Sequence, residues 1–166
     1  MASACSLAAM TDADTPWYED VALSALLRHA RATYGAAMRQ ALDDAGYDDI
    51  PGNGLYVIGG LAIGADGVPL GQLIRELRIT KQAAGQLVDT LVTRGYLHRT
   101  TDDQDRRKLT VGLTERGQAA AATQSAARER IDAELLERVG PDAVGATRKT
   151  LAALIAMGPL AEAQEH

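Results

Sequence analysis

Apolar side chains recur every three or four positions over residues 17–45, the spacing that places them on one face of an α-helix. Gly46 then supplies a helix stop. This pattern predicts a long first helix. Turn-forming residues at 48–54 separate it from a compact apolar run at 55–63, which predicts a short buried helix closed by the glycine-rich turn 64–67.

The middle of the chain predicts two more short helices joined by a tight turn. Apolar residues at 70, 73, 74 and 77 form one face of a two-turn helix. Thr80 is a good N-cap for a second helix, which Gly95 ends. Its inward positions are expected to be Ala83, Ala84, Leu87, Val88, Leu91 and Val92. Together these helices form a helix-turn-helix.

The pattern then changes from helical spacing to alternation. Residues 97–101 and 108–113 predict two strands, the second with Leu109, Val111 and Leu113 on one face. The charged turn 102–107 connects them. The sequence therefore predicts a β-hairpin, or wing, directly after the second helix of the motif.

Two alanine-rich helices follow the hairpin. Thr114 caps a helix that runs to about residue 138, and Pro141 fits the first turn of a last helix over 142–157. These helices and the first are longer than a small winged domain needs. Because their faces allow close helix–helix approach, a two-fold dimer is expected to bury them.

The fold class predicted is mainly α with a small β-hairpin wing (α+β). Residues 1–15 are expected to be a disordered tail and residues 159–166 a second tail. Residues 16–46 and 114–158 are expected to form a helical dimerisation region. Residues 50–113 are expected to be a winged helix-turn-helix domain.

The composition limits the number of domains and the kinds of site that the chain can form. The 166 residues, 46% of them hydrophobic, suffice for one core. There is no apolar run near ~18 residues and no signal-peptide pattern, so the protein is expected to be soluble and cytoplasmic. A single cysteine, Cys5, and three scattered histidines show no metal-ligand spacing, so neither metal nor cofactor is expected.

The formal net charge of −5 at first argues against a nucleic-acid partner. The distribution of charge along the chain reverses that inference. Residues 71–108 hold eight Lys/Arg and five Asp/Glu, whereas the rest of the chain holds nine Lys/Arg and seventeen Asp/Glu. A basic segment inside an acidic frame is typical of a protein with one face on DNA.

In the second helix of the motif, Thr80, Lys81, Gln82 and Gln86 are the candidate DNA-binding residues. Gln82 and Gln86 share a face, and a glutamine amide can pair bidentately with adenine. Lys81 can meet phosphate or guanine, and Gly85 permits close approach to the groove. An ordinary solvent-facing helix carries the same residue types, so it is the position between turn and wing that favours DNA.

Arg106, Arg107 and Lys108 sit at the hairpin tip, where long cations can enter the minor groove or bind phosphate. Three neighbouring aspartates would repel DNA unless they orient an arginine or stabilise the turn. A solvated charged turn is the alternative. Arg94 and Arg99 fit a surface ion pair as well as a phosphate contact.

These residues resemble the MarR family of bacterial transcriptional regulators over about residues 17–157. The likeness rests on 70–73, 80–97 and the wing, where the family pattern D-x-R-D-x-R maps onto residues 102–107 and L-T-x-x-G onto 113–117. Gln104 departs from the pattern by replacing the first arginine, which puts in doubt an ion pair inside the wing.

The resemblance implies a homodimer on a near-palindromic operator, with recognition helix 80–94 in the major groove and wing 97–113 on the minor groove or backbone. It also implies a repressor released by a small apolar or aromatic effector. Tyr34, Met38 and Tyr56 are candidate effector contacts, with core packing as their alternative role. Cys5 has no evident activating environment for redox sensing.

The sequence offers two alternatives to a DNA-binding regulator. A winged helix can also serve as a protein–protein interaction module without DNA binding. An enzyme is not expected, because the chain has no glycine-rich phosphate loop and no Cys/His or His/carboxylate cluster.

Overall fold

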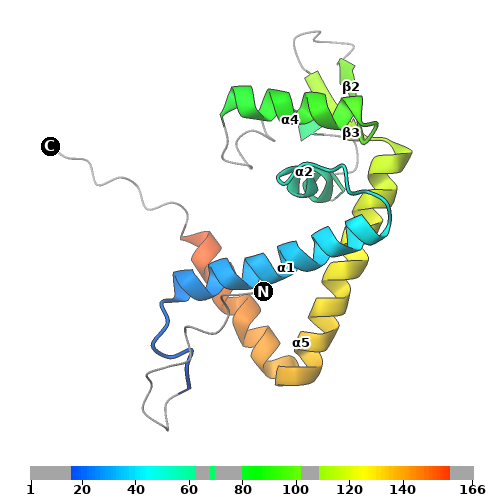
Figure 1. The fold of residues 1–166 in the computed structure, drawn as a ribbon. Helices are drawn as coiled ribbons and strands as arrows, with labels where there is room; N and C mark the ends of the chain where they lie inside the picture. Colours follow the sequence, from blue (N-terminus) through cyan, green and yellow to red (C-terminus); the bar gives the residue numbers. More distant parts are fainter. Residues whose placement is uncertain (1–15, 63–67, 70–79, 102–108, 158–166) are drawn as a thin grey trace, which may run out of the picture.

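The computed structural model describes residues 16–62, 68–69, 80–101 and 109–157 (Figure 1). Within these ranges the predicted mainly helical fold with a small hairpin is confirmed. The first helix of the predicted helix-turn-helix, residues 70–77, and the hairpin tip lie outside the described residues. The elements in chain order are α1 (Leu23–Asp44), α2 (Gly54–Leu61), β1 (Val68–Pro69), α4 (Lys81–Thr93), β2 (Leu97–Thr101), β3 (Leu109–Leu113) and α5 (Glu115–Ala156).

Helix α1 begins later than the apolar spacing predicted. Residues 17–20 form a turn, in which the Glu19 amide donates to the Pro16 carbonyl over 3.0 Å. The N-cap position holds Ala22, which offers no side-chain cap. The prediction of a helix from residue 17 was therefore wrong by about a turn and a half, because spacing alone does not specify where a helix is capped.

The sheet has three strands in the order β1-β3-β2, and all neighbours are antiparallel. The predicted hairpin is confirmed, with Leu97 opposite Leu113 and Arg99 opposite Val111. Strand β1 was not predicted, since its two residues are too few to show alternation. It pairs with β3 through Val68 opposite Val111.

The core lies where the end of α1, α2, α4, the sheet and the start of α5 meet (Figure 1). Of the predicted inward positions on α4, Ala84, Val88 and Leu91 are buried, and Leu87 and Val92 are partly buried against them. Ala83 is exposed, contrary to prediction, because it lies at the edge of the apolar stripe on the opening turn.

Helix α5 bends sharply and its second limb turns back towards α1 (Figure 1). The bend occurs at Gly140, whose φ of +79° falls in the left-handed region that favours glycine, and Pro141 follows it. The prediction of two helices separated at Pro141 is thus confirmed. No helix among the described residues is both long and apolar enough to cross a membrane.

The first turn of α5 is joined to the end of α4 by Thr114 and Gly117. The Thr114 hydroxyl accepts from the Gly117 amide over 3.1 Å and contacts the Tyr96 carbonyl at 3.1 Å. A Cβ built on Gly117 would lie 2.1 Å from that carbonyl oxygen. The backbone of α5 therefore approaches Tyr96 to a distance that only glycine allows.

We predict that Gly117→Ala lowers the free energy of unfolding by about 3 kcal/mol, because the backbone of α5 or of Tyr96 must move. Urea unfolding measures this. Gly60→Ala is the matched control, since a Cβ there meets nothing within 4 Å, and it should stabilise the fold by about 0.5–1 kcal/mol. Equal effects of the two substitutions would contradict the close contact.

Candidate nucleic-acid interface

The start of α4 is capped as the sequence predicted. Thr80 is extended, and its hydroxyl accepts from the Ala83 amide over 3.2 Å. The cap satisfies one of the free amides that every helix start presents. The remaining free amides at this end carry the positive end of the helix dipole, which attracts phosphate.

The polar side chains of α4 form one exposed face. Lys81, Gln82 and Gln86 are all exposed, and the two glutamines lie one turn apart. Gly85 lies between them, and a Cβ added there would meet nothing within 4 Å. Four residues, Lys81, Gln82, Gly85 and Gln86, form this reading face, the surface that the sequence predicts to contact DNA bases. Its backbone can be approached closely from solvent at Gly85.

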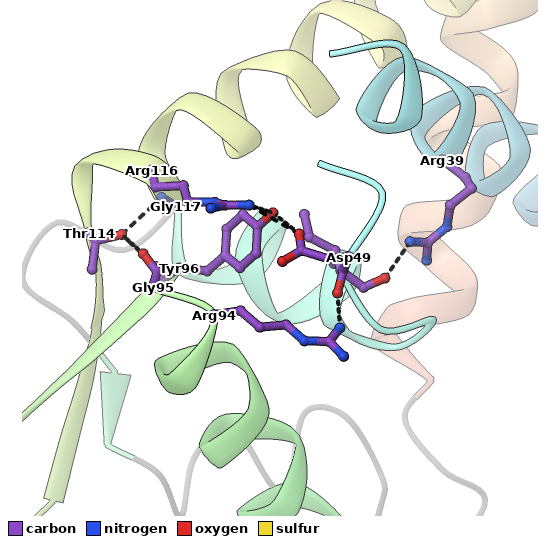
Figure 2. A network of polar contacts seen from close by, with 9 residues as sticks. Arg39, Asp49, Arg94, Gly95, Tyr96, Thr114, Arg116 and Gly117 are labelled. Atoms are coloured by element: carbon purple, nitrogen blue, oxygen red, sulfur yellow. Dashed lines mark hydrogen bonds and ion pairs between the residues drawn. The ribbon is translucent and has the colours of Figure 1, made fainter. Parts of the chain in front are cut away.

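The structure assigns partners to the two arginines whose roles the sequence left open. Arg99 on β2 forms an ion pair with Asp89 on α4. Arg94, just after α4, donates a hydrogen bond to the backbone carbonyl of Asp49 (Figure 2). Both arginines are thus engaged within the chain, and the ion-pair alternative is the one observed for Arg99.

A polar network centred on Asp49 joins the loop between α1 and α2 to α4 and α5 (Figure 2). The Asp49 carboxylate accepts from the Tyr96 hydroxyl and, over 3.2 Å, from the Arg116 guanidinium. Arg116 also donates to the Tyr96 hydroxyl over 2.9 Å and lies 4.5 Å from the centre of its ring. Three segments that are distant in sequence are therefore held at one carboxylate.

The network shifts the pKa values of Tyr96 and Arg116. Burial raises the pKa of the Tyr96 phenol, and the hydrogen bond to the Asp49 carboxylate raises it further. The pKa of Arg116 is also raised, chiefly because the Tyr96 hydroxyl accepts its hydrogen bond. Both shifts favour the neutral phenol and the charged guanidinium that the network needs.

The same loop is anchored from α1 by Arg39. Its guanidinium donates to the Ile50 carbonyl over 2.8 Å and to the Gly52 carbonyl over 3.1 Å. The sequence indicated only turn chemistry at residues 48–54, so the roles of Asp49 and Arg39 were missed. The sequence gives no local signal for them, because the partners of Asp49 lie at least 45 residues away and those of Arg39 lie across a turn, outside its own helix.

The candidate effector residues occupy different surroundings. Met38 is 6% exposed and packs in the core. The half-buried Tyr34 donates to Asp132 on α5; this hydrogen bond, followed by burial, raises the pKa of its phenol. Half-buried Tyr56 has the Arg31 guanidinium 4.7 Å from its ring centre. Tyr34 and Tyr56 therefore lie where α1 packs against α5 and α2, and each has a charged side chain beside it.

Three predicted contacts, Arg106, Arg107 and Lys108, lie outside the described residues, as does Cys5. Strand β2 ends at Thr101, before the segment that holds the three cations, and strand β3 begins at Leu109, after it. Across the described ranges no group of three or more His, Cys, Asp or Glu side chains is placed to hold a metal ion.

A capped amphipathic helix, α4, followed directly by the β2–β3 hairpin is the arrangement found in winged-helix proteins. Residues 48–108 match the model of the MarR family. The resemblance to the MarR family that the sequence indicated is therefore confirmed over this segment. No curated protein matches the chain.

Several solved structures share the fold. Streptococcus pneumoniae FabT in complex with DNA has a TM-score of 0.71 at 18% identity, covering 81% of this chain and 94% of FabT. The S. aureus MepR–DNA complex has a TM-score of 0.68 at 19% identity, covering 83% and 99%. The transcriptional regulator PA4135 has a TM-score of 0.65 at 21% identity, covering 84% and 99%.

We predict that Tyr96→Phe lowers the free energy of unfolding by about 1–2 kcal/mol at pH 7, because the Asp49 carboxylate loses a donor. Since folding raises the pKa of Tyr96, its contribution is fully present below the unfolded pKa of about 10 and is lost as pH rises through the folded value. Urea unfolding should show the difference from wild type shrinking above pH 10. A difference that stays constant to pH 11 would contradict this.

Proposed function

We propose that this chain is a sequence-specific DNA-binding transcriptional regulator that acts as a homodimer on a near-palindromic operator. The recognition helix, residues 80–94, enters the major groove, and the wing, residues 97–113, lies on the minor groove or backbone. The observation that carries the proposal is the exposed reading face of α4 beside the β2–β3 hairpin.

The chemistry of the reading face supports base recognition. The Gln82 and Gln86 amides each offer a donor and an acceptor, the pair that adenine presents in the major groove. Lys81 stands at the capped start of α4, where its charge and the helix dipole both attract phosphate. The FabT and MepR structures are of proteins of this fold in complex with DNA.

Exposed apolar side chains support a homodimer. They lie before and at the start of α1 and along the second part of α5, away from the reading face: Trp17, Tyr18, Leu23, Leu135, Leu136, Val139, Leu154, Ile155 and Met157. Large apolar side chains exposed on two neighbouring helices are typical of an interface. A two-fold dimer through these segments would place two copies of α4 on successive major grooves.

The regulator is proposed to be a repressor that a small apolar or aromatic effector releases from DNA. Tyr34 and Tyr56 are the proposed contacts, because their rings lie where α1, α2 and α5 meet. Met38 is proposed as a third contact, reached only if the core around it opens. An effector that separates these helices would change the spacing of the two recognition helices.

Selection of bound fragments from fragmented genomic DNA by the purified protein tests the function. The expected result is enrichment of a near-palindrome bound with nanomolar, salt-sensitive affinity. Absence of any DNA binding at low salt would overturn the proposal and favour a protein–protein interaction module.

We predict that Gln82→Ala and Gln86→Ala each weaken binding to the selected operator by about 1–3 kcal/mol and relax base preference at one position per half-site. Repeating the selection with each variant measures the preference. Gln40→Ala, an exposed glutamine on α1, is the matched control and should leave both unchanged. Retention of full base preference in both reading-face variants would exclude α4 as the reader.

We predict that the double variant Arg106→Gln/Arg107→Gln weakens operator binding by at least tenfold and lowers the slope of log affinity against log salt by about 1–2, since each lost phosphate contact removes ~0.9. The double variant Arg28→Gln/Arg130→Gln removes the same charge from exposed positions on α1 and α5 and serves as the control. Unchanged operator affinity in the first variant would exclude the wing from DNA contact.

A further inference from the structure

The reading face of α4 continues into an acidic residue. Asp89 lies three positions after Gln86 and seven after Gln82, so all three side chains share one side of the helix. Its side chain is 62% exposed. A carboxylate in this place repels phosphate by simple electrostatics, so its presence on a DNA-facing surface requires an explanation.

The explanation is the ion pair with Arg99. Arg99 stands opposite Val111 in the hairpin, and alternation along β2 places it on the same side as the buried Leu97. It therefore leaves the sheet on the side that packs against α4, and it reaches Asp89 there. The Arg99 side chain is only 33% exposed, half the exposure of its partner.

We propose that the Asp89–Arg99 pair is a clamp that sets the direction of the wing strands relative to the reading face, so that both meet DNA together. The inference rests on the proposed function. In this role Arg99 is a positioning residue rather than a phosphate contact, and Asp89 assists DNA binding despite its negative charge. The pair also neutralises the one carboxylate that follows the two glutamines on their side of α4.

The geometry favours a clamp over two independent surface charges. The pair joins α4 to β2 two residues beyond the buried Leu97, so it gives the hairpin a second attachment to α4 besides the junction at Tyr96. An exposed pair contributes little to overall stability. Its effect is expected in the orientation of the hairpin rather than in the free energy of unfolding.

The clamp and simple electrostatics predict opposite signs for Asp89→Asn. Removing a negative charge beside DNA strengthens binding if Asp89 acts only through its charge. Loss of the clamp weakens binding instead, by about two- to fivefold for an exposed pair. Asp43→Asn, an exposed aspartate at the end of α1, is the matched control and should leave affinity unchanged.

The first experiment uses the free full-length protein and does not depend on DNA. Amide hydrogen exchange of residues 97–101 and 109–113 should be about two- to fivefold faster in Asp89→Asn and in Arg99→Gln than in wild type, with exchange in residues 119–127 of α5 unchanged. Unchanged exchange in the hairpin, or a uniform increase over the whole chain, would overturn the clamp. If wild type binds no DNA, the proposed function fails and this experiment alone decides the inference.

The second experiment measures operator affinity and the hydroxyl-radical footprint for both single variants and for Asp89→Asn/Arg99→Gln. The clamp predicts that the double variant binds no more weakly than the weaker single variant, because each substitution removes the same interaction. It also predicts that protection is lost beside the wing and kept beneath α4. Tighter binding by Asp89→Asn, additive effects, or a new base preference with an unchanged footprint would overturn it.

Discussion

The arrangement of the molecule depends on one close backbone contact, that of Gly117 with the carbonyl of Tyr96. Tyr96 follows the end of α4 and precedes β2, while Gly117 lies in the first turn of α5. Thr114 reinforces the contact by capping α5 and bonding to the same carbonyl. Helix α4, the β2–β3 hairpin and helix α5 therefore all meet beside this one contact.

Asp49 adds an electrostatic tie at the same place (Figure 2). Its carboxylate binds Tyr96 and Arg116, and its backbone carbonyl binds Arg94. The loop between α1 and α2 is thereby attached to the end of α4 and the start of α5. The network thus connects the loop that follows α1 to the helix that carries the reading face, and Tyr34 of α1 is bonded to Asp132 of α5.

Local features of the fold were predictable because their signals are local. The Thr80 and Thr114 caps, the alternation in β3 and the Gly140–Pro141 break each depend on residues within a few positions of each other. The late start of α1 and the two-residue strand β1 were missed because neither leaves a pattern long enough to detect. Ala83 was misplaced for a related reason, since spacing alone does not locate the edge of an apolar stripe.

The candidate site likewise has features that local sequence predicts and features that it does not. Exposure of Lys81, Gln82 and Gln86 followed from helical periodicity, and the structure bears it out. The partners of Asp49, Asp89, Arg94 and Arg99 were not predictable, because each pairing joins different elements and depends on tertiary geometry. A charged residue in a sequence does not show whether it is solvated or paired within the chain, and the fold decides which partner it has.

Photo-cross-linking tests most directly the proposal that α4 contacts the bases and that the hairpin contacts the DNA beside them. The selected operator would carry 5-iododeoxyuridine at each thymine in turn, and the cross-linked peptide would be identified by mass spectrometry. Cross-links to the half-site centres are expected to fall on the proposed recognition helix, residues 80–94, and those to the flanks within the proposed wing, residues 97–113. Cross-links confined to α1 or to the second part of α5 would contradict it.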